Sequence, residues 1–543
     1  MSDSLHELWL RGIAFNPAAP SDVLIRLVDR AAGEVGLLMC EGRDLPDAVI
    51  DTALRHPLGE IRRALAVNQH VDPSRLAPLA TDPSGIVRAR LAGGSRSYPR
   101  RVRPLPDDIL VTLLTAQDGG EDGKVTEHEI VAELDSSRQI PLSFLSVTAG
   151  HEHPGLRVRA TWRWQSLTAA QREALLDDPD AAVREAARES SWELDPEAVE
   201  ARLRSIGPRG RSFVFGTCAL SPALVEQCFE DGRVYPLTWN RHTPADAVAR
   251  LARHPEAEVR AMVAVRPDLG PDLVAELRED PDEEVRMCAR LHPFTRTWAE
   301  YGAIQGVIGH GPDCTCPATE PATGPATGPA TGPATGPATG PATGPATGPA
   351  TGPATGPATG PTTESAAGPS PDWFAACAVS EEPVLRRVAA SWPGLPTELV
   401  GTLAQDDDEE VRIRLACHHP LAPPHLLLDV FVNRPVHRPH LLNLPAFPRT
   451  GRTHLIGHPD PEVRALAAAD PALPDPPVED PDASVRRAAA ANPNLLPEAL
   501  EALLADPRTA EGAAANPALP VPRMHALLDR CLNGAVTPPA ARR

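Results

Sequence analysis

Two cysteines near the middle of the chain carry side chains suited to holding a metal. Cys314 and Cys316 lie in the segment His310-Gly-Pro-Asp-Cys-Thr-Cys, and Cys288 and His292 lie upstream. Thiolate and imidazole groups are common ligands of zinc and of iron–sulfur clusters. His310, Cys314 and Cys316 are therefore candidate ligands for either. The alternative interpretation is two solvent-facing thiols beside a low-complexity segment.

A second set of candidate ligands lies in an acidic loop, Asp118-Gly-Gly-Glu-Asp-Gly-Lys-Val-Thr-Glu-His-Glu129. The loop resembles an EF-hand calcium loop, with Asp118 at position 1, Asp122 at position 5 and Glu129 at position 12. Gly120 stands at position 3 and supplies no side-chain oxygen. The loop is thus either a calcium site or an expanded acidic surface loop.

No pattern of catalytic residues accompanies these candidates. The sequence contains no Gly-rich phosphate loop, no His-Glu-x-x-His and no Gly-x-Ser-x-Gly. We therefore expect no catalytic residues, no enzyme activity and, apart from the candidate calcium, zinc or iron–sulfur sites, no cofactor.

The composition indicates which classes of partner are disfavoured and which cellular compartment is expected. The net charge of −20 disfavours nucleic acid and anionic membranes, which both require a basic surface. The nine cysteines are odd in number and irregularly spaced, which favours reduced thiols in the cytoplasm. The sequence shows neither a signal peptide at its start nor an apolar run long enough for a membrane span.

The elements that must position these residues come from a degenerate repeat of about 25 residues. Its marker is an apolar residue followed by Arg. The marker occurs at Ile61-Arg62, Val87-Arg88, Val158-Arg159, Val183-Arg184, Val259-Arg260, Val285-Arg286, Leu385-Arg386, Val411-Arg412, Val463-Arg464 and Val485-Arg486. A fixed period of this length is typical of a solenoid.

Each repeat is predicted to contain one helix, a corner at a proline and a second, shorter helix. Asp or His, usually followed by Pro, stands six residues before the Arg, as in Asp280-Pro281 and His254-Pro255, and fits a helix N-cap with Pro at the first helical position. A second Pro, such as Pro271, begins another apolar segment, which we expect to be a short helix of the α or the 3-10 type. Asn-Pro often precedes that corner, as at Asn16, Asn492 and Asn516.

Segments such as Asp280-Pro-Asp-Glu-Glu-Val-Arg286, and the segment from Val485 to Leu500, resemble the leucine-rich repeat variant family. The resemblance covers roughly residues 8–292 and 371–528. It implies an all-α, right-handed α-solenoid, related to ARM and HEAT repeats, of sixteen to eighteen short repeats. A cysteine segment that binds a cluster beside the repeats is known in that family, which adds weight to a site at Cys314 and Cys316.

The recurrent arginines are interpreted as structural. An Arg six residues after an Asp can bond an Asp of the neighbouring repeat or a carbonyl at a helix end, whereas an anion-binding ladder is the functional alternative. We assign this structural role to Arg62, Arg88, Arg184, Arg260, Arg286, Arg412 and Arg486. The His residues at the cap position are interpreted as substitutes for Asp.

The predicted domains are a repeat array at 1–292 with an insertion at about 100–150, a segment at 293–370, a second array at 371–530 and a disordered tail at 531–543. Residues 321–360 are ten copies of Pro-Ala-Thr-Gly and are predicted to be disordered. The segment 293–370 is either an insertion within one repeat or a linker between two arrays. The function predicted is a non-enzymatic scaffold that binds an unidentified protein or peptide; the alternative is a metal-binding regulatory or redox protein.

Overall fold

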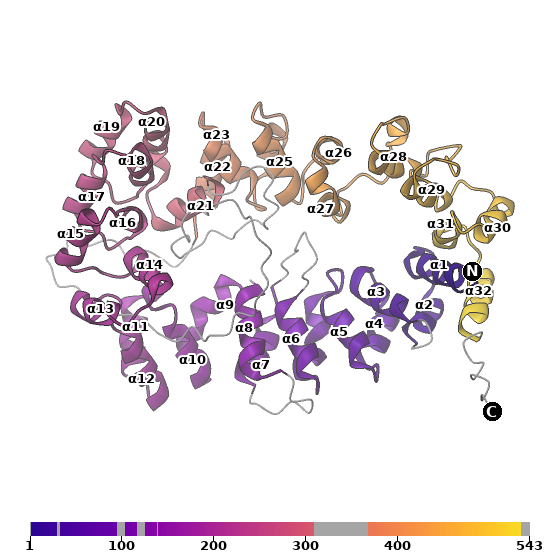
Figure 1. Cartoon of the computed structure of the whole chain (residues 1–543), viewed down its shortest axis with the longest axis horizontal. Coiled ribbons are helices and arrows are strands. Elements are labelled where there is room, and N and C mark those ends of the chain that lie inside the picture. The colour runs from indigo at the N-terminus through magenta and orange to yellow at the C-terminus, as the bar shows by residue number, and fades with distance from the viewer. Residues whose placement is uncertain are drawn as a thin grey trace. The chain divides into compact units, whose positions relative to one another are not determined.

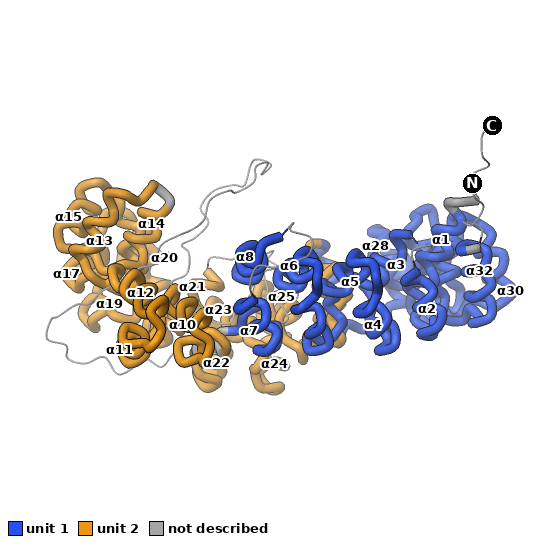
Figure 2. Tube along the Cα trace, turned by 90° about the horizontal axis from the view of Figure 1, so that it is seen from below, with its two compact units in different colours: residues 1–141, 431–435, 447–543 blue, residues 142–430, 436–446 orange. Residues whose placement is uncertain are grey.

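The computed structural model describes residues 2–29, 33–94, 104–116, 125–137, 139–308 and 368–533. Within these ranges every regular element is an α-helix or a 3-10 helix, so the all-α prediction is confirmed (Figure 1). The chain divides into two compact units. Unit 1 comprises residues 1–141, 431–435 and 447–543, and unit 2 comprises residues 142–430 and 436–446 (Figure 2).

Unit 1 is assembled from helices near both ends of the sequence. They are α1 (Ser2–Phe15), α2 (Ser21–Val28), α3 (Glu34–Gly42), α4 (Asp47–Leu54), α5 (Gly59–Ala66), η2 (Pro73–Thr81), α6 (Gly85–Gly93), α7 (Asp107–Thr115), α8 (Glu127–Ser137), η7 (Thr453–Leu455), α28 (Pro461–Ala468), α29 (Ala483–Ala490), α30 (Pro497–Ala505), α31 (Ala510–Ala515) and α32 (Val521–Asn533). Helix α32 extends into the predicted tail as far as Asn533, and helices α7 and α8 fall within the predicted insertion.

Unit 2 holds the middle of the chain. Its helices are α9 (Leu142–Val147), η3 (Thr148–Gly150), α10 (Pro154–Thr161), η4 (Trp164–Ser166), α11 (Ala169–Leu176), α12 (Ala181–Ser190), α13 (Pro196–Leu203), α14 (Pro208–Thr217), α15 (Pro222–Glu230), α16 (Tyr235–Trp239), α17 (Ala245–Leu251), α18 (Ala257–Ala264), α19 (Pro271–Arg278), α20 (Glu283–Arg290), η5 (His292–Phe294), α21 (Trp298–Ile308), α22 (Pro371–Ala378), α23 (Pro383–Ala390), α24 (Thr397–Leu403), α25 (Glu409–His418) and α27 (Arg438–Leu442). Helices α26 (Pro424–Asn433) and η6 (Pro435–His437) cross the unit boundary.

The predicted helix starts are displaced by two residues in most repeats. The cap of α20 is Asp282, whose carboxylate accepts the N–H groups of Glu284 and Val285. Asp280 lies two residues earlier, and its carboxylate accepts the N–H of Asp282 over 2.9 Å. Its side chain therefore holds the turn before the helix rather than the helix end.

The histidines do substitute for Asp in this turn. His254 Nδ1 accepts the N–H of Glu256 over 3.2 Å, as Asp280 does for Asp282. His153 differs, because it is itself the cap of α10, with Pro154 at the first helical position. An imidazole nitrogen and a carboxylate oxygen are both acceptors, which explains why the two residue types interchange here.

The second helix of most repeats is α-helical and not 3-10. Helices α15, α19 and α30 each begin with a Pro and run for eight or nine residues. Pro73–Thr81, which also begins with a Pro, adopts the 3-10 form, as does the short η7 before α28. Two helices of two turns each therefore fit within a repeat of about 25 residues, since the connecting turns are short.

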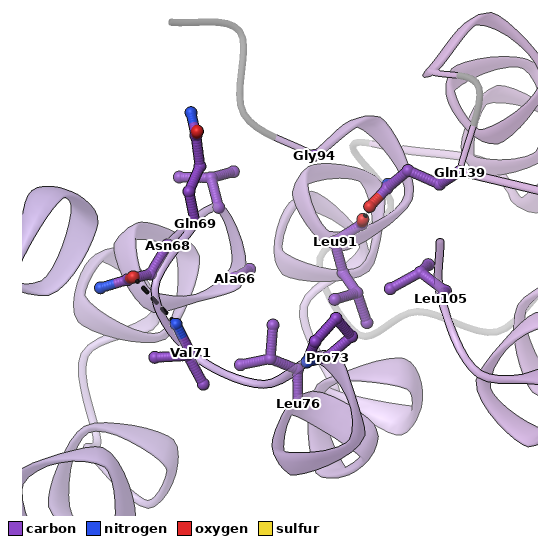
Figure 3. Close-up of a pocket in the computed structure, with 11 residues that line it drawn as sticks. Ala66, Asn68, Gln69, Val71, Pro73, Leu76, Leu91, Gly94, Leu105 and Gln139 are labelled. Carbon is purple, nitrogen blue, oxygen red and sulfur yellow. Dashed lines mark hydrogen bonds between the residues drawn. The ribbon is translucent and has the colours of Figure 1, made fainter. Parts of the chain in front are cut away.

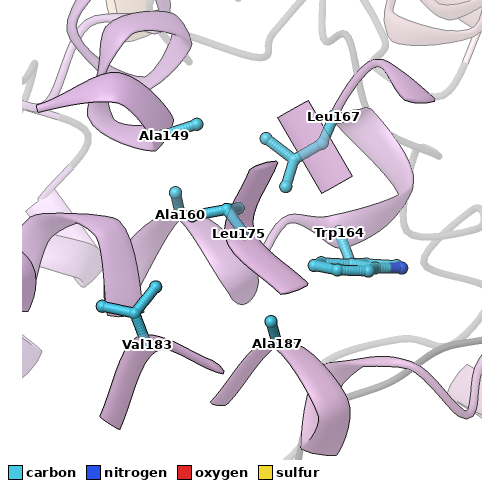
Figure 4. Close-up of a cluster of buried hydrophobic side chains, with 7 residues drawn as sticks. All are labelled: Ala149, Ala160, Trp164, Leu167, Leu175, Val183 and Ala187. Atoms are coloured by element: carbon cyan, nitrogen blue, oxygen red, sulfur yellow. The ribbon is translucent and has the colours of Figure 1, made fainter. Parts of the chain in front are cut away.

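The apolar residue before the marker Arg lies in the core in nine of the ten markers. The eight residues of this column are at most 4% exposed, namely Ile61, Val87, Val183, Val259, Val285, Val411, Val463 and Val485. Figure 4 shows the surroundings of one of them, Val183, with Ala187, Leu175, Ala160 and Trp164. The alanines keep these layers thin and the helices close together.

One predicted marker is out of register. Val158 is only partly buried, whereas Leu156 is fully buried. Leu156-Arg157 therefore occupies the repeat position that the sequence analysis gave to Val158-Arg159.

In unit 1, helices from the two ends of the sequence form one continuous stack. Helix α29 packs on α31, α31 on α1, α1 on α3 and α3 on α5 (Figure 1). A second row follows beside it, in which α32 contacts α2 and α2 contacts α4. The repeat formed by α1 and α2 therefore follows the repeat formed by α31 and α32.

Two glycines show that this junction has the geometry of an ordinary repeat contact. A Cβ at Gly512 would lie 2.2 Å from the carbonyl oxygen of Arg487 and 2.8 Å from the Cβ of Ala490. A Cβ at Gly12 would lie 2.3 Å from the carbonyl oxygen of Glu511 and 2.5 Å from the Cβ of Ala514. Helix α1 thus approaches α31 as closely as α31 approaches α29, and in the same register.

In unit 2, helices on the two sides of residues 309–367 pack on one another. Helix α21 contacts α23, and the indole N–H of Trp373 donates to the carbonyl of Phe294 over 2.8 Å. Arg290 forms an ion pair with Glu382 at 2.7 Å. The predicted disorder of residues 321–360 concerns residues outside the described ranges.

Candidate functional site

The marker arginines bond inside the protein. In the repeat of Arg260, Nε and Nη2 donate to the two carboxylate oxygens of Asp280 over 2.7 and 2.9 Å, and Nη1 donates to the carbonyls of His254 and Pro255. The hydrogen bonds from Arg260 lower the pKa of Asp280. The same bidentate hydrogen bonding links Arg62 to Asp82, Arg157 to Asp178, Arg386 to Asp406 and Arg464 to Asp480.

The remaining marker arginines bond to the turn that precedes their own helix. Arg286 Nη1 donates to the carbonyls of Asp280 and Pro281, six and five residues earlier. The equivalent bonds are made by Arg184, Arg412 and Arg486. Arg88 donates to the carbonyl of Asp82 and pairs with Glu127. These guanidinium groups hold turns and neighbouring repeats together.

Of the candidate calcium ligands, the described residues include Glu129 alone. Its carboxylate accepts the backbone N–H of Thr126 over 2.7 Å and the hydroxyl of Thr126 over 3.0 Å. These hydrogen bonds lower its pKa. Glu129 thus completes a capping box at the start of α8. Asp118, Asp122, His310, Cys314 and Cys316 lie outside the described residues.

The described cysteines are mostly buried thiols. Burial raises the pKa of Cys40, Cys288 and Cys417 to about 12, so these thiols stay protonated near neutral pH. Within the ranges that the structure describes, no three His, Cys, Asp or Glu side chains are grouped so that they could hold a metal ion.

A buried carboxylate in unit 2 was not identified from the sequence. Glu193 follows α12 and is 6% exposed, and its Oε2 accepts the amide of Gln165 over 2.5 Å. Burial raises the pKa of Glu193 to about 7, against which the Gln165 hydrogen bond acts. Its backbone carbonyl accepts the N–H of Ala219, so the turn is fixed from two sides.

Three histidines gather at the end of α25. Burial lowers the pKa of His418 to about 3, and the nearby charges of His440, Arg414 and His437 act in the same direction. Cys417 Sγ lies 3.6 Å from His437 Nδ1. Because burial raises the pKa of Cys417, its sulfur is a thiol and not an activated thiolate.

A ladder of asparagines runs inside the stack of unit 1. The amide nitrogen of Asn492 donates to the carbonyls of Ala468 and Asp470, and that of Asn516 donates to the carbonyls of Ala490 and Asn492. Asn16 continues the series at the junction of α1 and α31, with bonds to Ala514 and Asn516. The Asn-Pro dipeptides were visible in the sequence, but their bonding to the preceding repeat was not.

A small pocket lies where this ladder lacks a side chain. Its volume is about 30 Å³, and it lies among α5, α6 and the residues that follow them (Figure 3). Ala66 and Asn68 line one side, and Gly94 and Gln139 line the other. Apolar side chains complete the wall, among them Val71, Leu76, Leu91 and Leu105. This pocket is a candidate binding site within the described part of unit 1.

The comparisons with known proteins leave the family open. No protein-family model matches the chain, and no curated protein matches it. Among the described residues, no single helix has the length and hydropathy to cross a membrane; one sharply bent pair, Gly210–Thr217 with Pro222–Glu230, meets both criteria jointly.

Proposed function

We propose that the protein is a non-enzymatic interaction scaffold, a right-handed α-solenoid of repeats of about 25 residues. The observation that carries the proposal is the recurrence of the same contacts between successive repeats. The Arg–Asp pair joins residues 20 apart at Arg62, Arg260 and Arg386. Repeats that bond in this way form extended surfaces, which suit the binding of a protein or peptide in the cytoplasm.

An exposed tryptophan in unit 2 is the proposed contact point for that partner. Trp162 is 59% exposed, and the guanidinium of Arg159 lies 4.9 Å from the centre of its ring. Burial lowers the pKa of Arg159 to about 10. Tryptophan and arginine are enriched among the residues that dominate the binding energy of protein interfaces.

The test is affinity capture with the full-length protein, followed by reconstitution with the retained partner. Trp162→Ala should weaken a reconstituted complex by tenfold or more, that is by at least about 1.4 kcal/mol, without changing the melting temperature. Val379→Ala is the matched control, because Val379 is an apolar residue that is 68% exposed and is distant from Trp162 in the sequence. A retained molecule that is chemically converted would instead indicate an enzyme.

A further inference from the structure

The carbonyls that accept the amides of Asn492 and Asn516 occupy fixed positions in the preceding repeat. In the repeat of Arg486, the acceptors of Asn516 are Ala490 and Asn492, four and six residues after the Arg. In the repeat of Arg464, the acceptors of Asn492 are Ala468 and Asp470, again four and six residues after the Arg. The donor itself stands six residues after the marker position of its own repeat.

The same pair of carbonyls is reached in unit 2 by a larger donor. Arg266 stands six residues after Arg260, and its Nη1 donates to the carbonyls of Thr238 and Asn240 over 2.8 and 3.1 Å. The two carbonyls thus attract an N–H donor whether that donor is an amide or a guanidinium.

For the repeat of Arg62 this rule places the acceptors at Ala66 and Asn68, and the donor at position 94, six residues after Arg88. Position 94 is a glycine, which brings no donor. Among the backbone hydrogen bonds in the turns and loops of the described residues, none ends on the carbonyl of Ala66 or Asn68. Ala66, Asn68 and Gly94 all line the pocket of Figure 3.

Gln139 shapes the opposite side of this gap. Its amide nitrogen donates to the carbonyls of Leu91 and Ala92 over 2.8 and 2.7 Å, so its donor is already used. A Cβ at Gly94 would lie 3.1 Å from Gln139 Nε2 and 3.2 Å from Gln139 Oε1, so the Gln139 amide stands beside the missing side chain. The carbonyls of Ala66 and Asn68 are therefore the acceptors that an N–H donor in the gap would meet.

We propose that this pocket binds the N–H-bearing head group of a small ligand, a primary carboxamide or a primary ammonium, in the place of the absent asparagine amide. The head group donates to the carbonyls of Ala66 and Asn68, as the amide of Asn492 does to those of Ala468 and Asp470. A volume of about 30 Å³ admits a head group of this size and excludes a bulky one. The net charge of −20 also favours a cation over an anion.

The experiment is thermal unfolding of the full-length protein with matched additives. Acetamide and methylammonium should raise the melting temperature by about 1–3 °C at 100 mM, in a saturable manner. N,N-dimethylacetamide and tetramethylammonium, which carry no N–H, should not. Equal effects of the two groups of additives, or no effect of either, would overturn the proposal, since water alone then fills the gap.

Two variants locate the effect. Gly94→Asn supplies the missing amide. The φ of 61° and ψ of −164° at this position strain any side chain, so the variant should melt at a lower temperature than wild type and should show no response to acetamide. Asn492→Gly creates the same gap at Ala468 and Asp470, and acetamide should there restore part of the stability that the substitution removes. An unchanged response in Gly94→Asn, or an Asn492→Gly variant that acetamide does not stabilise further than wild type, contradicts the assignment. Neither outcome depends on whether the protein is a scaffold.

Discussion

The side-chain amide of Asn16 donates to the carbonyl oxygen of Ala514 over 2.9 Å, although 498 residues separate the two in the sequence. The same amide reaches the carbonyl of Asn516 over 2.7 Å. Around this pair, the indole N–H of Trp9 donates to Leu504, and Arg26 forms an ion pair with Asp529. Helices α1 and α2 therefore belong to the same stack as α31 and α32.

Removing the amide at this junction should destabilise unit 1. Asn16→Ala leaves the carbonyls of Ala514 and Asn516 without their donor, at a cost of about 1–3 kcal/mol. The matched control is Asn494→Ala, because Asn494 also bonds two carbonyls, those of Pro471 and Leu473, but is exposed. Chemical denaturation checks the difference; equal costs for the two variants would show that water replaces the Asn16 amide.

The Arg–Asp pairs between repeats should be coupled more strongly than surface ion pairs. The side chains of Arg260 and Asp280 are 13% and 8% exposed, whereas those of Arg253 and Glu276 are 56% and 45% exposed. A double-mutant cycle to alanine should give a coupling energy of about 2 kcal/mol for the first pair and below about 1 kcal/mol for the second. Similar coupling energies for both pairs would indicate that apolar contacts alone stabilise the packing of one repeat on the next.

A charge in the core column should be costly. Val285 is fully buried, so Val285→Asp introduces an unpaired charge and should cost on the order of 3 kcal/mol. Val379→Asp introduces the same charge at an exposed residue and should leave thermal unfolding nearly unchanged. If the two variants melt alike, the proposed register of the repeat is wrong.

Stability should fall as the pH rises through the titration of Glu193. Burial raises its pKa from 4.5 to about 7, so the folded state favours the protonated acid. Below pH 4.5, Glu193 is protonated in both the folded and the unfolded state, so its titration costs no stability. Between pH 4.5 and 7 the loss of stability grows as the unfolded state ionises first, and above pH 7 the loss is constant. The shift corresponds to about 3 kcal/mol.

Glu193→Gln keeps the shape and removes the charge. Its stability relative to wild type should therefore rise by up to about 3 kcal/mol between pH 4.5 and 8, as measured by urea denaturation at each pH. A pH-independent difference between the two proteins would show that Glu193 titrates normally.

Deleting residues 321–360 should leave the melting temperature within about 1 °C of the wild type, because ten copies of Pro-Ala-Thr-Gly bring too little apolar surface to stabilise a fold. Differential scanning calorimetry of the deletion variant is the measurement. A loss of several degrees would mean that the tract packs against a folded unit.

Much of the local structure follows from the sequence. Val285 and Arg286 mark a buried position and its structural arginine. A helix that packs in a thin layer needs an apolar residue at each turn, and the recurrence of that residue about every 25 positions identifies it in the sequence. The displacement of the helix cap from Asp280 to Asp282 was missed, because Asp serves equally well in the cap and in the turn before it.

The order in which repeats stack is set only by the tertiary structure. The repeats are similar in sequence, so the residues around Asn16 show neither that a pair of carbonyls accepts its amide nor which pair does so. Neighbours along the chain meet because the connecting turns are short. The contact of Asn16 with Ala514 joins residues 498 apart in the sequence, so no short connecting turn enforces it and only the tertiary structure of unit 1 decides it.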